Sequence, residues 1–286
     1  DFADTVSGIQ YFEYGVGTTS GGLDIRNWTN VGADVSINAA SLNLADETTY
    51  YVSVRATDGV GHVSGVVTTN GIMADHTGPS GTTVNDGDST DIELQNNLVS
   101  FSGNWESFSD EYSGMAYHEA ALYDATGGIY IVNWTDVGED TTTTFYGLTL
   151  VAGRTYEIHV RGVDLVGNTG AIIESDGVLI DLSAPTVPVN LVGWFTTGRI
   201  FLEWTANTEP DLGHYSIYGG TENNPTDLLL TTTENSVEAF MPEYQDGVLY
   251  YLRITATDIP GNESNFTNEV IGIPQETVIT SISPDT

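Results

Sequence analysis

The sequence LVAGRTYEIHVRGVD, residues 150–164, contains a leucine, a turn with a glycine and, six residues after the leucine, a tyrosine that opens an alternating run. In that run apolar side chains alternate with Glu157, His159 and Arg161. A period of two places successive side chains on opposite faces of a β-strand. The segment therefore predicts a strand with one buried face and one solvent-exposed face, followed by a turn at Asp164.

The pattern recurs along the chain at fixed distances. The triplet Asn-Trp-Thr at residues 27–29 is found again 106 residues later, at residues 133–135. A third, more diverged copy lies at an offset of 94 residues from the second, as Tyr250 and Asp258 show. The offset of 106 also relates Tyr50 to Tyr156, Asp58 to Asp164, Asp75 to Asp181 and Pro79 to Pro185. Self-similarity at a fixed period indicates duplicated domains.

Each copy predicts strands and turns. The alternating run is followed by residues typical of a turn, such as Asp58-Gly59, and then by another apolar run, which predicts a hairpin between the last two strands. No segment has a sustained apolar period of 3.6 residues, and Thr, Val, Ile and Tyr are abundant. The predicted fold class is therefore all-β.

The tyrosine pattern resembles the fibronectin type III family. In that family a leucine, a turn and a tyrosine form a tyrosine corner, in which the tyrosine hydroxyl bonds to upstream backbone. The pairs that match are Leu44 with Tyr50, Leu150 with Tyr156 and, less well, Tyr244 with Tyr250.

The third copy and the linkers extend the resemblance. Residues 200–204 and 211–218 are similar to strands B and C of fibronectin type III domains, and residues 75–79 and 181–185 resemble the linkers of bacterial surface-protein repeats. The resemblance implies tandem immunoglobulin-like or fibronectin type III-like β-sandwiches, of the kind found in extracellular surface proteins and adhesins.

The linkers predict the domain boundaries. By the offset of 106, residue 1 corresponds to residue 107, so the first copy is expected to lack its first two strands. Such a sandwich has an open edge and half a core, and the missing strands are expected upstream in a longer parent or donated in trans. We expect sandwiches at residues 1–79, 80–185 and 186–274, and at 275–286 a linker to a further domain.

The composition indicates a strongly acidic protein. Forty acidic residues against six arginines, with no lysine, give the chain a formal charge of −34, which repels nucleic acid and anionic membrane surfaces. The chain has no cysteine for disulfides or thiolate metal sites. It also has no apolar run long enough to span a bilayer. The charge favours a saline or calcium-containing medium. The resemblance to surface-protein repeats implies a location outside the cell or on its surface.

Acidic residues recur at the predicted loop ends. In a sandwich the last hairpin loop, the loop between strands B and C, and the incoming linker share one pole. Carboxylates there, with backbone carbonyls, are the hard oxygen ligands that calcium prefers. The predicted interdomain calcium ligands are Asp75, Asp110 and Asp164 at one junction and Asp181, Asp211 and Asp258 at the next. Asp58, Asp164 and Asp258, which share the position in the last hairpin loop, also fit Asx-type turns. No other cofactor is expected.

Trp28 and Trp134 occupy equivalent positions in two copies. A solvent-facing tryptophan can stack on a sugar ring or a partner, whereas a loop tryptophan folded over the edge of the sandwich would cover core. Both alternatives stay open. Trp105 and Trp204 are expected in the cores.

The sequence predicts no catalytic site. The five histidines form no close metal pair, and no Gly-x-Ser-x-Gly or other nucleophile motif is present. Paired carboxylates for glycoside hydrolysis are not favoured, because the aspartates that recur lie in predicted structural loops.

Three functions fit these observations. The first is a non-catalytic spacer or stalk of a large secreted or cell-surface adhesin or filament, whose partners are its neighbouring repeats. The second is an accessory module of a secreted polysaccharide-degrading enzyme or protease, with weak binding of carbohydrate such as surface glycans. The third is binding of a protein partner, or self-assembly, through a sheet edge or a loop pole.

Overall fold

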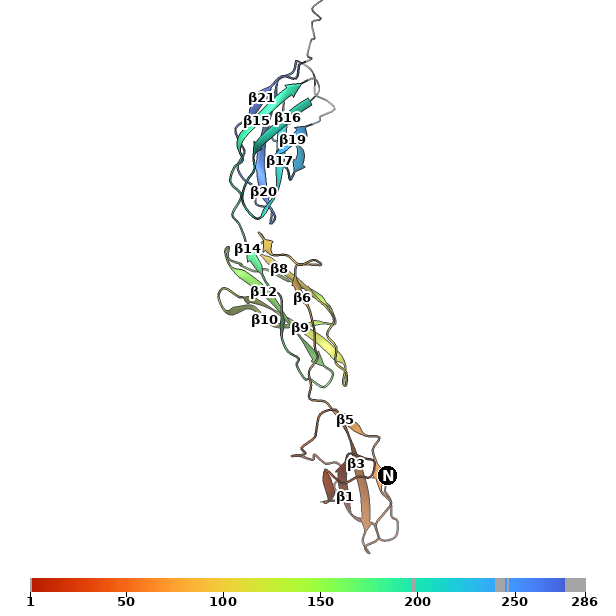
Figure 1. Ribbon diagram of the computed structural model, residues 1–286. Coiled ribbons are helices and arrows are strands. Elements are labelled where there is room, and N and C mark those ends of the chain that lie inside the picture. Colours follow the sequence, from red (N-terminus) through yellow and green to blue (C-terminus); the bar gives the residue numbers. More distant parts are fainter. Residues whose placement is uncertain (1, 197–198, 240–244, 246, 276–286) are drawn as a thin grey trace, which may run out of the picture.

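The computed structural model describes residues 2–196, 199–239, 245 and 247–275. They form three groups of β-sheets, which lie end to end in an extended array (Figure 1). Each group has its own hydrophobic cluster. Within the described ranges, no helix has the length and apolar character needed to cross a membrane. The all-β prediction is confirmed.

The second domain is a sandwich of two sheets, the arrangement in which inner faces pack to form one core. One sheet has the order β11-β8-β6, formed by β6 (Val84–Asp86), β8 (Ser100–Trp105) and β11 (Thr142–Tyr146). The other has the order β10-β9-β12-β14-β7, with β13 paired to β12. Its strands are β7 (Leu94–Gln95), β9 (Met115–Asp124), β10 (Ile129–Gly138), β12 (Thr155–Asp164), β13 (Ile173–Glu174) and β14 (Val178–Ile180).

The third domain repeats this plan with shorter loops. One sheet, in the order β15-β16-β19, is formed by β15 (Val189–Thr196), β16 (Arg199–Thr205) and β19 (Ser236–Ala239). The other, in the order β18-β17-β20-β21, is formed by β17 (Leu212–Gly220), β18 (Leu228–Thr232), β20 (Tyr250–Asp258) and β21 (Val270–Gly272).

The first domain differs, because its strands within residues 2–79 belong to a single sheet. The order is β2-β1-β3-β4, with β5 paired to β3, and the strands are β1 (Ile9–Gly17), β2 (Arg26–Gly32), β3 (Thr48–Asp58), β4 (Val67–Thr68) and β5 (Ile72–Ala74). By the repeat, residues 36–40 correspond to β11, which pairs with β8. The described residues contain no counterpart of β8, so residues 36–40 have no partner strand there and are irregular. The first domain thus has, among the described residues, no strand equivalent to β11, an absence that the sequence does not predict.

The alternation of side chains decides what each sheet buries. In β12, Tyr156, Ile158 and Val160 are at most 1% exposed and pack against Phe101 and Trp105 of the facing sheet. Each large apolar side chain buried in this way stabilises the fold by about 1.5–3 kcal/mol. In the first domain the equivalent inner face is open and lines a groove of about 610 Å³.

A tyrosine corner is present in all three domains. In each, the tyrosine hydroxyl accepts a hydrogen bond from the backbone N–H five residues upstream, which fixes the chain as it enters the strand. The bonds join Ala45 to Tyr50 at 2.6 Å, Val151 to Tyr156 at 3.1 Å and Gln245 to Tyr250 at 3.0 Å. Tyr244, named with the third corner, lies outside the described residues.

Candidate metal sites at the domain junctions

Three acidic segments meet where the first domain joins the second. Asp75 follows β5 in the linker, Asp110 lies in the loop between β8 and β9, and Asp164 ends β12. One ligand oxygen from each lies within 4.8 Å of the other two. Oxygens that share a calcium ion are at most about 5 Å apart, because each Ca–O bond is about 2.3–2.6 Å long. The separation therefore fits a shared calcium ion.

Backbone amides hold the two loop carboxylates in place. Asp164 Oδ1 accepts hydrogen bonds from the N–H groups of residues 166–168 at 2.6–2.9 Å. Asp110 Oδ1 accepts them from residues 112–114 at 2.8–3.1 Å. Both are Asx-type turns; the sequence predicts the one at Asp164, and the one at Asp110 is found in the structure. The turns and the metal site are compatible, because the turns fix one oxygen of each carboxylate.

These amides also keep both groups ionised. Burial raises the pKa of Asp110, but the N–H groups of Gly114 and Ser113 outweigh it and leave the pKa below its usual value. Burial likewise raises the pKa of Asp164, and hydrogen bonds from Asn168 reverse the effect. A donor to the charged form favours that form. Both carboxyl groups are therefore in the state that binds a cation.

Asn168 joins the linker to the last hairpin loop. Its Nδ2 donates to Asp164 Oδ2 at 2.8 Å and to the backbone carbonyl of Asp75 at 3.0 Å. Asp75 Oδ1 accepts from the N–H of Thr77 at 3.1 Å, whereas Asp75 Oδ2 is buried with no hydrogen-bond partner among the described residues. Leaving a buried carboxylate oxygen unpaired is costly. A cation would supply the missing partner.

The junction between the second and third domains has the same construction. Ligand oxygens of Asp181, Asp211 and Asp258 lie within 4.8 Å of one another. Asn262 Nδ2 donates to Asp258 Oδ2 at 2.8 Å and to the backbone carbonyl of Asp181 at 3.0 Å, as Asn168 does at the first junction. The structure thus brings all six aspartates together in the two expected groups, and their binding of calcium stays a prediction.

Trp28 and Trp134 lie on strands β2 and β10, so the alternative that places them in loops is wrong. The guanidinium of Arg55 lies 4.3 Å from the centre of the Trp28 ring, and that of Arg161 lies 4.2 Å from the Trp134 ring. Both rings are half-buried. One face of each ring is therefore covered by arginine in a cation–π contact, and sugar binding by these rings stays a prediction.

Sequence reasoning misses two further groups of potential ligands. Each depends on a pairing between segments that no short motif reveals. The Asp-Gly pairs at residues 86–87 and 176–177 are typical of turns, but the sequence does not show that these two segments meet. The groups are Asp86 with Asp91 and Asp176, and Glu157 with His159 and Glu174. In the first group, Asp86 is fully buried and accepts hydrogen bonds from Ser175 Oγ at 2.8 Å and the N–H of Gly177 at 2.9 Å.

The chain is similar in sequence to a known protein and in structure to several solved ones. No protein family model matches the chain. It is 28% identical over 139 residues to Exoglucanase B of Cellulomonas fimi; the match covers 46% of this chain but only 12% of the exoglucanase. The FN1–FN3 domains of chicken CNTN1 are 14% identical, with a TM-score of 0.44 and coverage of 96% of this chain and 91% of theirs. Domains A168–A170 of titin are 13% identical, with a TM-score of 0.46 and coverage of 82% and 78%.

Strand order and local geometry define the fold. A three-stranded sheet faces a longer sheet in the second and third domains, and a tyrosine corner precedes the equivalent strands β3, β12 and β20 in all three. This combination is that of the immunoglobulin-like sandwiches. The chain is a tandem array of fibronectin type III-like and immunoglobulin-like domains, of which the second and third are complete two-sheet β-sandwiches among the described residues.

Proposed function

We propose that this chain is a non-catalytic spacer of a secreted or cell-surface protein, and that calcium stiffens its domain junctions. The observation that carries the proposal is the recurrence of one aspartate triad at both junctions, each built from a linker and two loops of the following domain. A cation bound by all three would fix the linker against that domain. Fixed linkers keep tandem domains in a constant geometry, as a stalk requires.

The charge of the chain supports the same proposal. A formal charge of −34 opposes the close approach of acidic loops and linkers. At each junction three carboxylates lie within 4.8 Å, so a divalent cation would cancel most of the local repulsion. The spacer is therefore expected to be more stable and straighter in calcium than in a chelator.

Thermal unfolding of the full chain tests the proposal. We expect the melting temperature to be higher in millimolar calcium than in excess EDTA at matched ionic strength, because a ligand present at 100 times its Kd stabilises the folded state by about 2.7 kcal/mol. Asp110→Asn and Asp211→Asn should each remove the part of the response that belongs to one junction. Asp34→Asn, an exposed change outside the acidic groups, controls for the loss of one charge. An unchanged melting temperature in calcium, or an equal response in all variants, would contradict the calcium sites.

A second candidate function is an accessory module of a polysaccharide-degrading enzyme. The similarity to Exoglucanase B over 46% of the chain favours it. If it holds, the chain should be retained on insoluble cellulose, and Trp134→Ala should weaken retention more than Tyr146→Ala, which removes an exposed aromatic ring from β11. Absence of retention would remove the carbohydrate-binding part of this proposal and leave the spacer role.

A further inference from the structure

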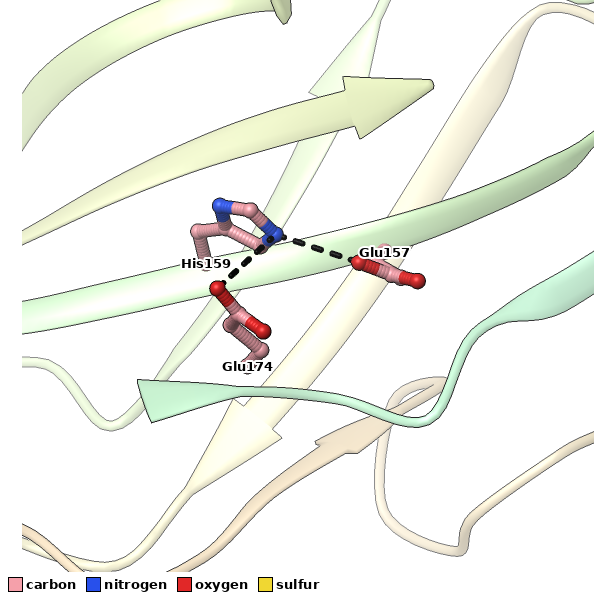
Figure 2. A group of neighbouring side chains, drawn as sticks. All are labelled: Glu157, His159 and Glu174. Atoms are coloured by element: carbon pink, nitrogen blue, oxygen red, sulfur yellow. Dashed lines mark hydrogen bonds and ion pairs between the residues drawn. The ribbon is translucent and has the colours of Figure 1, made fainter. Parts of the chain in front are cut away.

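One group of side chains on the second domain is unrelated to the junctions. In β12 the side chains of Glu157, His159 and Arg161 alternate with the core residues and lie on the outer face of the sheet. Strand β13 is antiparallel to β12, with Glu174 directly opposite His159. Figure 2 shows the three potential ligands Glu157, His159 and Glu174 converging from these two strands.

His159 is buried although it lies on an outer face. It is 4% exposed, because Tyr123 stacks on its ring with centroids 4.8 Å apart and Tyr130 packs edge-on at 5.5 Å. The Tyr130 hydroxyl lies 3.1 Å from Nδ1. Nε2 instead faces the two carboxylates, at 3.2 Å from Glu157 Oε2 and 4.0 Å from Glu174 Oε1. The aromatic rings thus fix the imidazole with one nitrogen directed at both acids.

The geometry points to a site for a transition-metal ion, and we propose that Glu157, His159 and Glu174 bind zinc. Tetrahedral ligands with bonds of about 2.0–2.2 Å are about 3.3–3.6 Å apart. The 3.2 Å separation of Nε2 and Glu157 Oε2 is close to this, and the Glu174 side chain is 59% exposed and free to move inward. One imidazole with two carboxylates suits zinc better than calcium, which prefers oxygen ligands alone.

The surroundings of His159 also provide an oxygen for its other ring nitrogen. A metal-bound histidine donates its other ring N–H to an oxygen, which fixes the tautomer. Tyr130 places its hydroxyl oxygen at Nδ1 for this purpose. The nearby Arg161 is paired with Glu119 at 2.7 Å and covers Trp134. Within the described residues, neither Glu157 nor Glu174 is paired with an arginine, so both carboxylates are available to a cation.

The repeat shows that the fold does not need these ligands. In the first domain the residues opposite one another at the same place are Ser53 and Thr68, whose hydroxyl oxygens lie 2.9 Å apart. In the third domain the counterpart of His159 is Arg253, which donates to the carbonyls of Pro225 and Asn224. The zinc site belongs to the second domain alone among the three, and the first domain offers a natural replacement for it.

The test is zinc binding by the full chain in saturating calcium, which occupies the oxygen-only sites. We expect calorimetry to detect one zinc ion per chain, and cobalt at the same site to give the visible absorption of tetrahedral coordination. The double variant His159→Ser with Glu174→Thr, which copies the first domain, should fold and lose both. Tyr130→Phe removes the oxygen that holds His159 Nδ1 and should weaken zinc binding about 10- to 100-fold.

Three results would overturn the proposal. The first is no zinc binding by the wild-type chain, which leaves His159 as a histidine paired with surface acids. The second is equal zinc affinity in the wild type and the double variant, which places the ion elsewhere. The third is a cobalt spectrum that is octahedral in the wild type. Circular dichroism of the double variant separates a lost site from a lost fold.

Discussion

His118 places a titratable ring inside the core of the second domain. It is 4% exposed, and its ring centroid lies 5.9 Å from that of Trp105 and 5.4 Å from that of Phe108, both edge-on. Burial lowers the pKa of His118 below its usual value, so the folded state binds a proton less well than the unfolded state. The free energy of unfolding is therefore not reduced by His118 above its unfolded pKa of about 6.5. It decreases as the pH falls below that value, because the unfolded state then binds the proton more readily.

The variant His118→Phe should remove this pH dependence. The first domain has Phe12 at the equivalent position, so the replacement suits the fold. We expect the urea midpoint of the wild type to fall more than that of the variant between about pH 7 and pH 5. Unfolding followed by tryptophan fluorescence in the full chain measures it. Parallel curves for the two proteins would show that His118 does not titrate on unfolding.

Asp86 has the opposite effect to His118 on the pH dependence of stability. Burial raises its pKa to about 6, above the value of about 3.9 expected in the unfolded chain. The folded state therefore holds this proton more tightly, and the stability contributed by the protonated group is lost as the pH rises from about 4 to about 6.

Asp86→Asn should relieve the cost of this buried charge. The amide keeps one acceptor and can donate to Ser175 Oγ, which now donates to Asp86 at 2.8 Å. In EDTA we expect the variant to be more stable than the wild type at neutral pH, on the order of 1–3 kcal/mol, with the advantage lost near pH 4. Thermal unfolding at both pH values measures the difference. An advantage that is independent of pH would mean that ionisation of Asp86 is not its cause.

At the scale of a structural element, the tyrosine corner stabilises the fold through a hydrogen bond between residues that are close in sequence. The Tyr156 hydroxyl is the acceptor for the N–H of Val151 at 3.1 Å, and its ring is 1% exposed. Tyr156→Phe keeps the ring and leaves that N–H without its acceptor, at a cost of about 1–2 kcal/mol. Chemical denaturation of the full chain should show the loss in the transition of the second domain. Tyr146→Phe, in a side chain that is 78% exposed, should leave the same transition unchanged.

The elements that the sequence predicts well are those specified locally. Strand β12 and the turn at Asp164 follow from alternation and turn residues within about 15 positions, and the two aspartate triads follow once a sandwich brings three loops to one pole. The sequence does not predict the features that depend on a partner segment far away in the chain. Residues 36–40 are irregular for want of a partner strand, and Glu174 meets His159 through a cross-strand register, which no local pattern contains.

Over the whole molecule, the three domains differ in how much core they have. Among the described residues, the buried clusters contain twelve residues in the second domain and nine in the third, but only Tyr14, Val16 and Tyr50 in the first. Local unfolding costs less where less apolar surface is buried. The first domain should therefore open at the lowest free energy, although its strands β1 and β3, of 9 and 11 residues, are nearly equal in length to their counterparts β9 and β12, of 10 residues each.

Hydrogen exchange along the full chain measures this difference in local stability between the domains and separates it from the effect of calcium. We expect the amides of β1 and β3 to exchange faster than those of β9, β12, β17 and β20, with or without calcium, because the first junction site uses only the linker and two loops of the second domain. Calcium should instead slow exchange in residues 112–114 and 166–168, whose N–H groups hold the carboxylates of Asp110 and Asp164.

Equal protection of all three domains would contradict the expected difference in local stability. Slowing of β1 and β3 to the same extent as these loops would mean that the cation stabilises the first domain as a whole, and that the two neighbours unfold as one unit.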